Sequence, residues 1–277
     1  MLGKLIKHEF RATARIMLPV MGALLALALL ANLSLRGLTG DANDITVLRI
    51  LFVLTVIFFG IGVVATAVMA VVIMVSRFYR NLLKDEGYLM FTLPVSVHEL
   101  VWSKLLVSLV WFLATGLLIF LVMSLTALNL ANTNLEMIIE QFPSWAEIRR
   151  FLDEAGIRGQ VLTLIFQIGL AILLTSIVGC LHFYAAMALG HMFTKNKILL
   201  SIVFFIGFSF AFNMMEMAYG AVGFGLFDSG LMEMTEYTDG LRFVSTITWH
   251  GIILSAIQGA VLYLATVLGL KRGLNLE

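Results

Sequence analysis

Residues 77–104 read RFYRNLLKDEGYLMFTLPVSVHELVWSK, and they separate two long apolar runs of the chain. Charged, aromatic and turn-forming residues gather in this stretch, whereas the sequence on either side of it is almost entirely apolar. Cations and aromatic rings at the start of the stretch are typical of the headgroup level of a bilayer. The stretch therefore predicts a structured loop at a membrane surface, and the apolar runs beside it decide the fold.

The composition is that of a membrane protein. Of the 277 residues, 61% are hydrophobic and 13% are charged, and the mean hydropathy is +1.01. Soluble domains are about 45–50% apolar and about 25% charged, so a soluble protein is excluded. The apolar runs are too long and too uniform for the alternating strands of a β-barrel. The expected fold class is an all-α polytopic membrane protein. The single cysteine, Cys180, excludes an intrachain disulfide and argues against a structural zinc site.

Six apolar runs are long enough to cross the hydrocarbon core, which takes roughly 20 residues. These spans are 16–35, 45–75, 105–130, 161–189, 198–217 and 246–270. The N-terminus, the 77–104 loop, the 191–197 loop and the C-terminus together carry twelve Lys and Arg, and the other three connections carry six. By the positive-inside rule, both termini are therefore cytoplasmic. Residues 131–160 and 218–245 become outer loops, and residues 16–277 form a single six-helix transmembrane domain.

Residues 1–15 predict an amphipathic helix that lies on the membrane and leads into the first span. The cationic side chains that share one face of it are Lys4, Lys7, Arg11 and Arg15. A basic face opposite an apolar one suits an anionic cytoplasmic surface. A signal peptide is the alternative, but the apolar run that follows is longer than the usual core of such a peptide. Glu9 points from the apolar face, and either snorkelling or an ion pair with Arg77 or Arg80 accounts for it.

The central loop carries two helix signals in sequence. The range 80–93 predicts a short helix that ends before Pro94, because the residue before a proline is kept out of the α region. Ser96 and Glu99 have the spacing of a capping box, so a new helix begins at Ser96 and becomes the third span. A flexible connector does not need this layout. The loop is therefore interpreted as an interface with another protein.

This combination of features resembles the permease subunit of ABC-2 type transporters, the group that includes the ABCG-like exporters. The likeness rests on the basic N-terminal helix, on six spans with both ends cytoplasmic, and on the segment KDEGYLMFTLPVSVHELVWSKLL. Within that segment Glu86 and Gly87 match the acidic residue and glycine of the family. The range 93–96 matches its Leu-Pro-Val-Ser-type turn, and 104–106 matches the Lys-Leu-Leu start of its third span.

The resemblance implies that 80–93 is a coupling helix seated in a groove of a separate cytoplasmic ATPase subunit, which binds ATP and Mg. The residues that it assigns to docking are Arg80, Lys84, Asp85, Glu86, Gly87, Tyr88, Leu89, Phe91 and Pro94. The resemblance also implies a second copy of this chain or a related permease, export as the direction, a path lined by spans two and five, and a bacterial plasma membrane.

Span five carries a stripe of aromatic and methionine side chains that ends in a carboxylate. The possible substrate path consists of Phe204, Phe208, Phe212, Met215 and Glu216. Adaptable surfaces of this kind suit an apolar or amphipathic cargo such as a lipid, peptide or drug, although helix packing or lipid contact is the more common reason for such a stripe. Glu216 lies about 27 Å along the span at about 1.5 Å per residue, so an acid at the outer boundary is favoured over a buried ion site.

The chain lacks the motifs of a nucleotide-binding or catalytic domain. It has no G-x-x-x-x-G-K-[ST] loop, and its two His-Glu pairs lack the second histidine of a zinc protease. We therefore expect no enzyme activity, no cofactor in this chain and no nucleic-acid partner. Two alternatives remain open. One is an ATP-independent secondary transporter or channel, for which the spans offer only Glu216 as an intramembrane acid. The other is a non-transporting membrane partner protein, which would not need a coupling loop.

Overall fold

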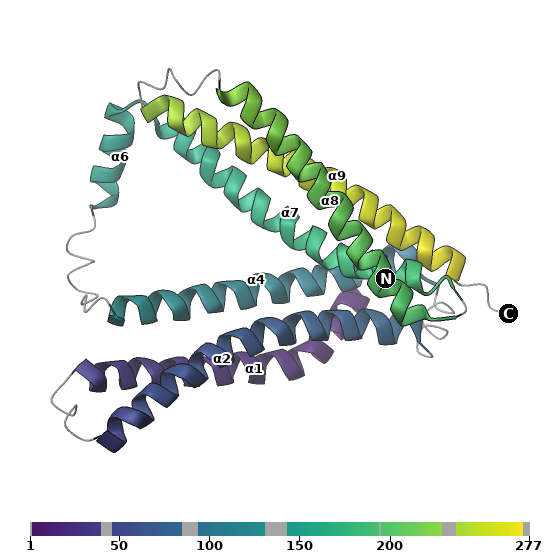
Figure 1. Ribbon diagram of the computed structural model, residues 1–277, viewed down its shortest axis with the longest axis horizontal. Coiled ribbons are helices and arrows are strands. Elements are labelled where there is room, and N and C mark those ends of the chain that lie inside the picture. The colour runs from purple at the N-terminus through teal and green to yellow at the C-terminus, as the bar shows by residue number, and fades with distance from the viewer. Residues whose placement is uncertain are drawn as a thin grey trace. The chain divides into compact units, whose positions relative to one another are not determined.

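The computed structural model describes residues 2–39, 46–84, 94–130, 143–193, 195–228 and 237–273. These residues form helices joined by short turns, with no strand among them. The helices are α1 (Leu2–Thr39), α2 (Thr46–Phe78), η2 (Tyr79–Leu83), α4 (Val97–Leu130), α6 (Trp145–Glu154), α7 (Arg158–Gly190), α8 (Lys197–Asp228) and α9 (Tyr237–Gly273) (Figure 1).

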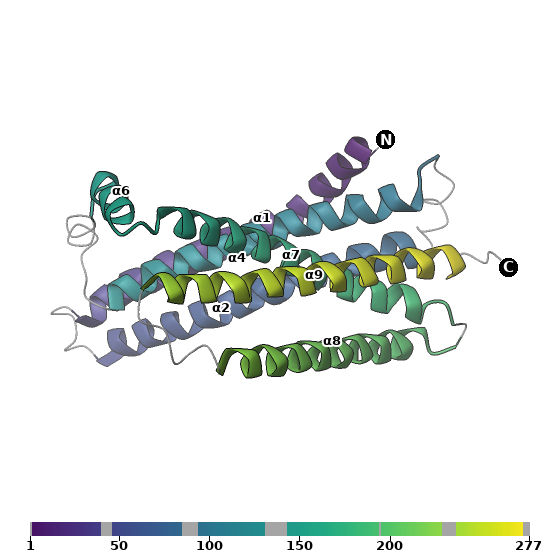
Figure 2. The ribbon, with the colours of Figure 1, turned by 90° about the horizontal axis from the view of Figure 1, so that it is seen from above.

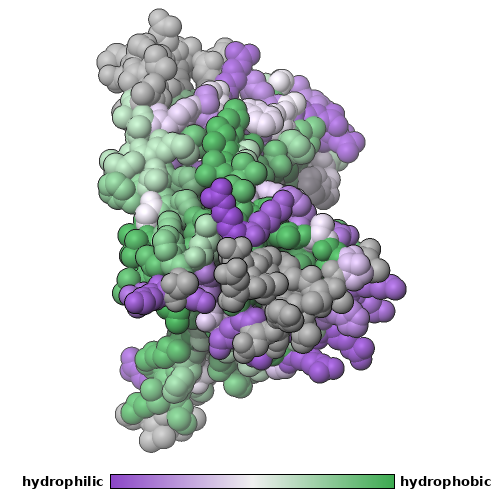
Figure 3. Space-filling view, turned by 90° about the vertical axis from the view of Figure 1, so that its right-hand side faces the viewer, coloured by the Kyte–Doolittle hydropathy of each residue, from purple (hydrophilic) through white to green (hydrophobic). Residues whose placement is uncertain are grey.

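Six of the described helices are long and apolar enough to cross a membrane. Large apolar side chains on their flanks are exposed, among them Leu29, Phe120 and Ile198. Figure 3 shows apolar flanks beside hydrophilic side chains that gather at helix ends. A helix satisfies its own backbone hydrogen bonds, so it is the structure that hydrocarbon permits. The predicted class of multi-pass helical membrane protein and the number of spans are confirmed.

The chain divides into two compact units. Unit 1 consists of Met1–Ser76 and Leu106–Ser144, and unit 2 consists of Arg77–Leu105 and Trp145–Glu277. Both boundaries near the central loop fall inside continuous helices, α2 and α4. The described parts of the central loop therefore belong with α7, α8 and α9.

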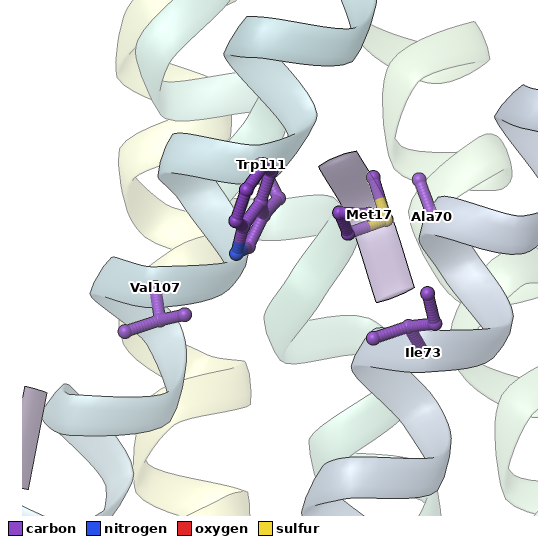
Figure 4. Packing of buried hydrophobic residues seen from close by; sticks show 5 residues of the cluster. All are labelled: Met17, Ala70, Ile73, Val107 and Trp111. Carbon is purple, nitrogen blue, oxygen red and sulfur yellow. The ribbon is translucent and has the colours of Figure 1, made fainter. Parts of the chain in front are cut away.

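Unit 1 is built from α1, α2 and most of α4. Met17 of α1 is fully buried between α2, through Ala70 and Ile73, and α4, through Val107 and Trp111 (Figure 4). A second buried cluster further along the same helices consists of Leu24, Ala28, Ala31, Phe59 and Val122. Beyond it, Asn32 donates a hydrogen bond to the Thr126 hydroxyl, 3.3 Å away. These contacts hold the first span of the chain along the third.

The sequence predicts a separate N-terminal helix before the first span, but no helix end occurs between the two. Residues 2–39 form the single helix α1, with Pro19 inside it. A proline has no N–H, so the carbonyl of Arg15 loses its usual helical donor at Pro19. The boundary expected after residue 15 therefore coincides with the weakest backbone position of a continuous helix (Figure 2).

In unit 2, α7 packs against both α8 and α9. Three contacts define the direction of α9 relative to α7. Gln167 donates a hydrogen bond to the Ser245 hydroxyl, Val178 lies against Gly259, and Ala188 lies against Gly269. Residue numbers rise together on the two helices, so α7 and α9 run parallel. The C-terminal ends of both helices therefore lie at one end of unit 2.

The expected outer loop between spans five and six is shorter than predicted. Helix α8 continues through the Gly-rich stretch to Asp228, and α9 begins at Tyr237, so much of 218–245 is helical. The short apolar stretch after residue 217 extends α8. In the connection between α4 and α7, the stretch after Pro143 forms the short helix α6. Residues 131–142, in the same predicted outer loop, lie outside the described residues.

Glycine at position 269 allows α7 and α9 to approach closely. A Cβ at this position would lie 2.9 Å from both the backbone carbon and the Cβ of Ala188. We expect Gly269→Ala to lower the unfolding midpoint in detergent, because overpacking of this kind costs about 1–3 kcal/mol. Gly251→Ala, on the same helix but with open space around it, is the matched control. Alanine there should leave the midpoint unchanged or raise it, since alanine favours helix by about 1 kcal/mol over glycine. Equal responses of the two variants would contradict the close approach.

Candidate functional site

The segment that the sequence singled out ends in a capping box. The backbone N–H of Glu99 donates to the Ser96 hydroxyl at 3.2 Å, and the backbone N–H of Ser96 donates to the Glu99 carboxylate at 3.0 Å. These two reciprocal bonds satisfy donors that a helix start otherwise leaves open. The predicted start of the third span at Ser96 is therefore confirmed, with α4 assigned from Val97.

The beginning of the same segment is fixed to α7. After Phe78, α2 changes into the π-helix η2, in which the backbone N–H of Lys84 donates to the carbonyl of Tyr79. Phe78 stacks on Tyr184 of α7 with ring centroids 4.0 Å apart, and both side chains are fully buried. Tyr79 contacts His191, at the end of α7, edge to face. Stacked and edge-to-face aromatic pairs add about 0.5–1.5 kcal/mol each beyond their burial.

The end of the segment is fixed to α9. The side chain of His98, in the first turn of α4, forms a hydrogen bond of 2.6 Å with the hydroxyl of Tyr263. Trp102, one turn later, contacts the same tyrosine ring with centroids 5.9 Å apart. Together, the four aromatic contacts to Tyr184, His191 and Tyr263 are called the clamp below. The clamp holds both flanks of the central loop on unit 2.

The clamp also places two connections and the C-terminal end of α9 at one end of unit 2. Tyr79 belongs to the α2–α4 connection and His191 to the α7–α8 connection. His98 contacts α9 near its C-terminal end, which lies beside the end of α7. The sequence placed these same three segments on one side of the membrane from their positive charge. The structure brings them to the same end of the unit.

The residues assigned to docking are only partly described. Arg80 in η2, Lys84 after it and Pro94 are exposed, and the Lys84 ammonium lies 5.6 Å from the centre of the Tyr79 ring. The other predicted docking residues lie outside the described residues. They are Asp85, Glu86, Gly87, Tyr88, Leu89 and Phe91. Of the predicted coupling helix at 80–93, the described part is therefore the end of η2.

The N-terminal part of α1 is amphipathic, as predicted. Lys4, Lys7, Arg11 and Arg15 are exposed, and Glu9 is buried on the opposite face. Next to it, the Thr13 hydroxyl bonds to the Glu9 carbonyl and accepts a hydrogen bond from the Trp111 indole at 2.8 Å. Phe10 stacks on the same indole. These contacts tie the start of α1 to α4 within unit 1.

The aromatic stripe of α8 faces α7. Phe204, Phe208, Phe212 and Met215 are half-buried. His182 of α7 contacts the rings of Phe205, Phe208 and Phe212, and its Nε2 lies 3.1 Å from both the Phe205 carbonyl and the Ser209 hydroxyl. The stripe and His182 therefore form a helix contact within unit 2.

Glu216 follows Phe212 by one turn of α8 but contacts α9 and not His182. Its side chain is exposed and accepts a 3.0 Å hydrogen bond from the buried Gln258 of α9. Because α8 continues to Asp228, Glu216 lies within the helix and not at its end.

No cluster of three or more metal-ligating side chains occurs in the described part of the chain. No protein-family model, curated protein or solved structure matches this chain. A functional conclusion therefore has to come from the residues themselves.

Sequence reasoning missed the partners of the clamp. Tyr184, His191 and Tyr263 lie in apolar runs or at their ends, and nothing in the local sequence marks them as partners of the central loop. The sequence marks Phe78 and Tyr79 as residues at headgroup level but gives no sign that both rings pack against α7. A spacing rule finds pairs within one helix, but these pairs join segments that are far apart in the sequence, up to 165 residues for His98 and Tyr263.

Loss of the capping box should loosen the start of α4. We expect Ser96→Ala to cost about 1 kcal/mol, and therefore to speed local amide exchange in the first turn of α4 roughly fivefold. Ser96→Thr keeps a capping hydroxyl and should exchange like the parent protein. Hydrogen–deuterium exchange with mass spectrometry in detergent measures both variants. If Ser96→Ala exchanges like the parent, the two bonds of the box do not stabilise this helix start.

The contact of His191 with Tyr79 should weaken in acid. Burial lowers the pKa of His191 below its usual 6.5, opposed by its hydrogen bond to the Met187 carbonyl and reinforced by Lys197. The unfolded chain then takes up a proton at a higher pH than the folded one, so acid favours unfolding. The stability is complete above about pH 6.5 and falls as the pH drops through that value toward the lower pKa of the folded state.

The measurement is the unfolding midpoint between pH 8 and pH 5.5, compared with that of His191→Phe, which keeps a ring beside Tyr79. The other histidines are present in both proteins, so the difference between the two pH profiles isolates His191. We expect the parent to lose more stability than the variant on acidification. Parallel pH profiles would contradict a neutral, partly buried His191.

Proposed function

We propose that this chain is the membrane-spanning permease subunit of an ATP-driven transporter of the ABC-2 type. A separate cytoplasmic subunit docks on the central loop and hydrolyses ATP, with ATP and Mg bound in that partner. Two permease subunits, either two copies of this chain or this chain and a related one, form the pathway. Both termini lie in the cytoplasm, and the complex exports an apolar or amphipathic substrate across a bacterial plasma membrane.

The clamp is the observation that carries the proposal. The first flank of the loop is held on α7 by buried and half-buried rings. The second flank starts with a reciprocal cap, and the exposed rings of His98 and Trp102 hold it on the half-buried Tyr263 of α9. A loop that only joins two spans needs neither feature. A loop that must pass a displacement from a docked protein to the spans needs both, because coupling travels through packed side chains and rigid elements.

The clamp also suggests how energy reaches the spans. Closure of the ATPase subunits around ATP displaces the docked loop, and the rings on Tyr184 and Tyr263 pass this movement to α7 and α9. The continuous helices α2 and α4 pass it to unit 1 along their backbones. The spans then alternate between inward and outward access.

Purification of the tagged protein from its native membrane tests the proposal. We expect a cytosolic protein with a Walker loop to be recovered with it at about one copy per permease, as in other complexes with large stable interfaces. Glu86→Lys should abolish this recovery, since it reverses a charge in the proposed docking surface. The control is Glu154→Lys on α6, an exposed glutamate outside the loop, which should retain the partner.

Recovery of the permease alone, in a detergent that keeps another membrane complex of the same cell intact, would refute the proposal. It would favour the ATP-independent transporter instead. Equal loss of the partner in both variants would show that the central loop is not the docking surface.

A further inference from the structure

The carboxylate of Glu216 lies within the apolar membrane-spanning segment of α8, Lys197–Ala221. At about 1.5 Å per residue, Glu216 is about 28 Å from Lys197 and about 8 Å before Ala221, the ends of that segment. Its partner Gln258 provides an independent measure of depth. Gln258 is about 27 Å from Gly240 and about 21 Å from Arg272, the ends of the apolar segment of α9. Gln258 is therefore near the middle of its membrane-spanning segment, and Glu216 lies within the segment of α8, nearer to its Ala221 end.

Gln258 positions the carboxylate and does not neutralise it. Its side chain is 95% buried, since 5% is exposed, and its amide donates one 3.0 Å hydrogen bond to Glu216. An ionised carboxylate accepts up to about four hydrogen bonds. No lysine or arginine among the described residues forms an ion pair with Glu216. A charge at this depth is costly unless it faces a cavity, a partner or an opposite charge.

Aromatic rings flank the carboxylate on its own helix. Phe212 is four residues before Glu216 and Tyr219 three residues after it, so both are neighbours of Glu216 on the surface of α8. Tyr219 is 37% exposed, and its ring contacts His250 of α9 with centroids 5.3 Å apart. A carboxylate between aromatic rings is the chemistry that recognises an organic cation, through charge and cation–π attraction. A metal ion would need several oxygen or nitrogen ligands, and the described residues provide no such group here.

We propose that Glu216, held by Gln258 and flanked by Phe212 and Tyr219, binds the cationic group of an amphipathic organic cation within the membrane. Only the identification of that cation as the transported substrate rests on the proposed function. Binding itself requires no partner subunit. The apolar part of such a ligand suits the exposed apolar flank of α8, where Ile206, Phe210 and Met217 are each at least 60% exposed.

A pair of probe ions of equal shape and opposite charge tests the site. Tetraphenylphosphonium and tetraphenylborate are both bulky and apolar, so only the sign of the charge differs. The purified protein is placed in phosphatidylcholine nanodiscs at pH 8, where a histidine with an ordinary pKa is neutral. Equilibrium dialysis measures binding, and empty nanodiscs provide the correction for partition into lipid. We expect the protein to bind the cation more tightly than the anion.

Three variants assign that preference. Glu216→Gln keeps the shape and should weaken cation binding about tenfold or more without changing anion binding, which corresponds to about 1.4 kcal/mol. Tyr219→Leu should weaken cation binding about threefold or more through loss of the ring face. Glu154→Gln on α6 is the control and should change neither. Unfolding midpoints identify any variant that fails to fold. If either Glu216→Gln or Tyr219→Leu does not fold, the cation affinity of the other variant tests the site.

Equal binding of both probes by the parent would overturn the proposal, as would full cation affinity in a folded Glu216→Gln or Tyr219→Leu protein. The assay contains no ATPase subunit. A negative result therefore removes the cation site alone, whereas a failure to recover an ATPase partner leaves the binding result intact.

Discussion

The stacking of Phe78 on Tyr184 is the contact on which the organisation of unit 2 depends. The two rings lie 4.0 Å apart and are fully buried, so the end of α2 is held against α7 and not at a free membrane surface. The chain must then turn and start α4 within reach of α9, where His98 and Trp102 meet Tyr263. One buried aromatic pair thus fixes the first flank of the central loop on α7.

This anchoring assigns the central loop to the second half of the chain, although it joins two helices of the first half. The boundaries of unit 2 fall after Ser76 and after Leu105, inside α2 and α4. A helix transmits displacement along its axis because each backbone hydrogen bond links successive turns. A partner bound at the loop would therefore act on α7 and α9 through side-chain packing and on unit 1 through two continuous helices.

Local signals predicted much of this fold, and contacts between distant segments account for the rest. Six spans, the cap at Ser96 and the basic face of α1 follow from composition and from spacings within one helix. The extension of α8 was missed because its glycines suggest a loop. Beyond residue 217 the Tyr219–His250 contact between α8 and α9 favours helix over that weak preference. The contacts of the clamp could not be predicted from the sequence, because each of its residues has the sequence context of an ordinary apolar or interfacial residue.

The sequence singles out Glu216, but the hydrogen bond from Gln258 changes where its carboxylate is placed relative to the membrane. With span five ending at residue 217, the carboxylate would sit at a polar boundary, where its charge costs little. With α8 continuing to Asp228 and Gln258 near the middle of α9, the same carboxylate lies in the apolar zone. A single amide donor leaves most of its acceptor capacity unused. An ammonium or similar cation between Phe212 and Tyr219 would donate further hydrogen bonds to the carboxylate. It would also give the carboxylate an opposite charge within the membrane.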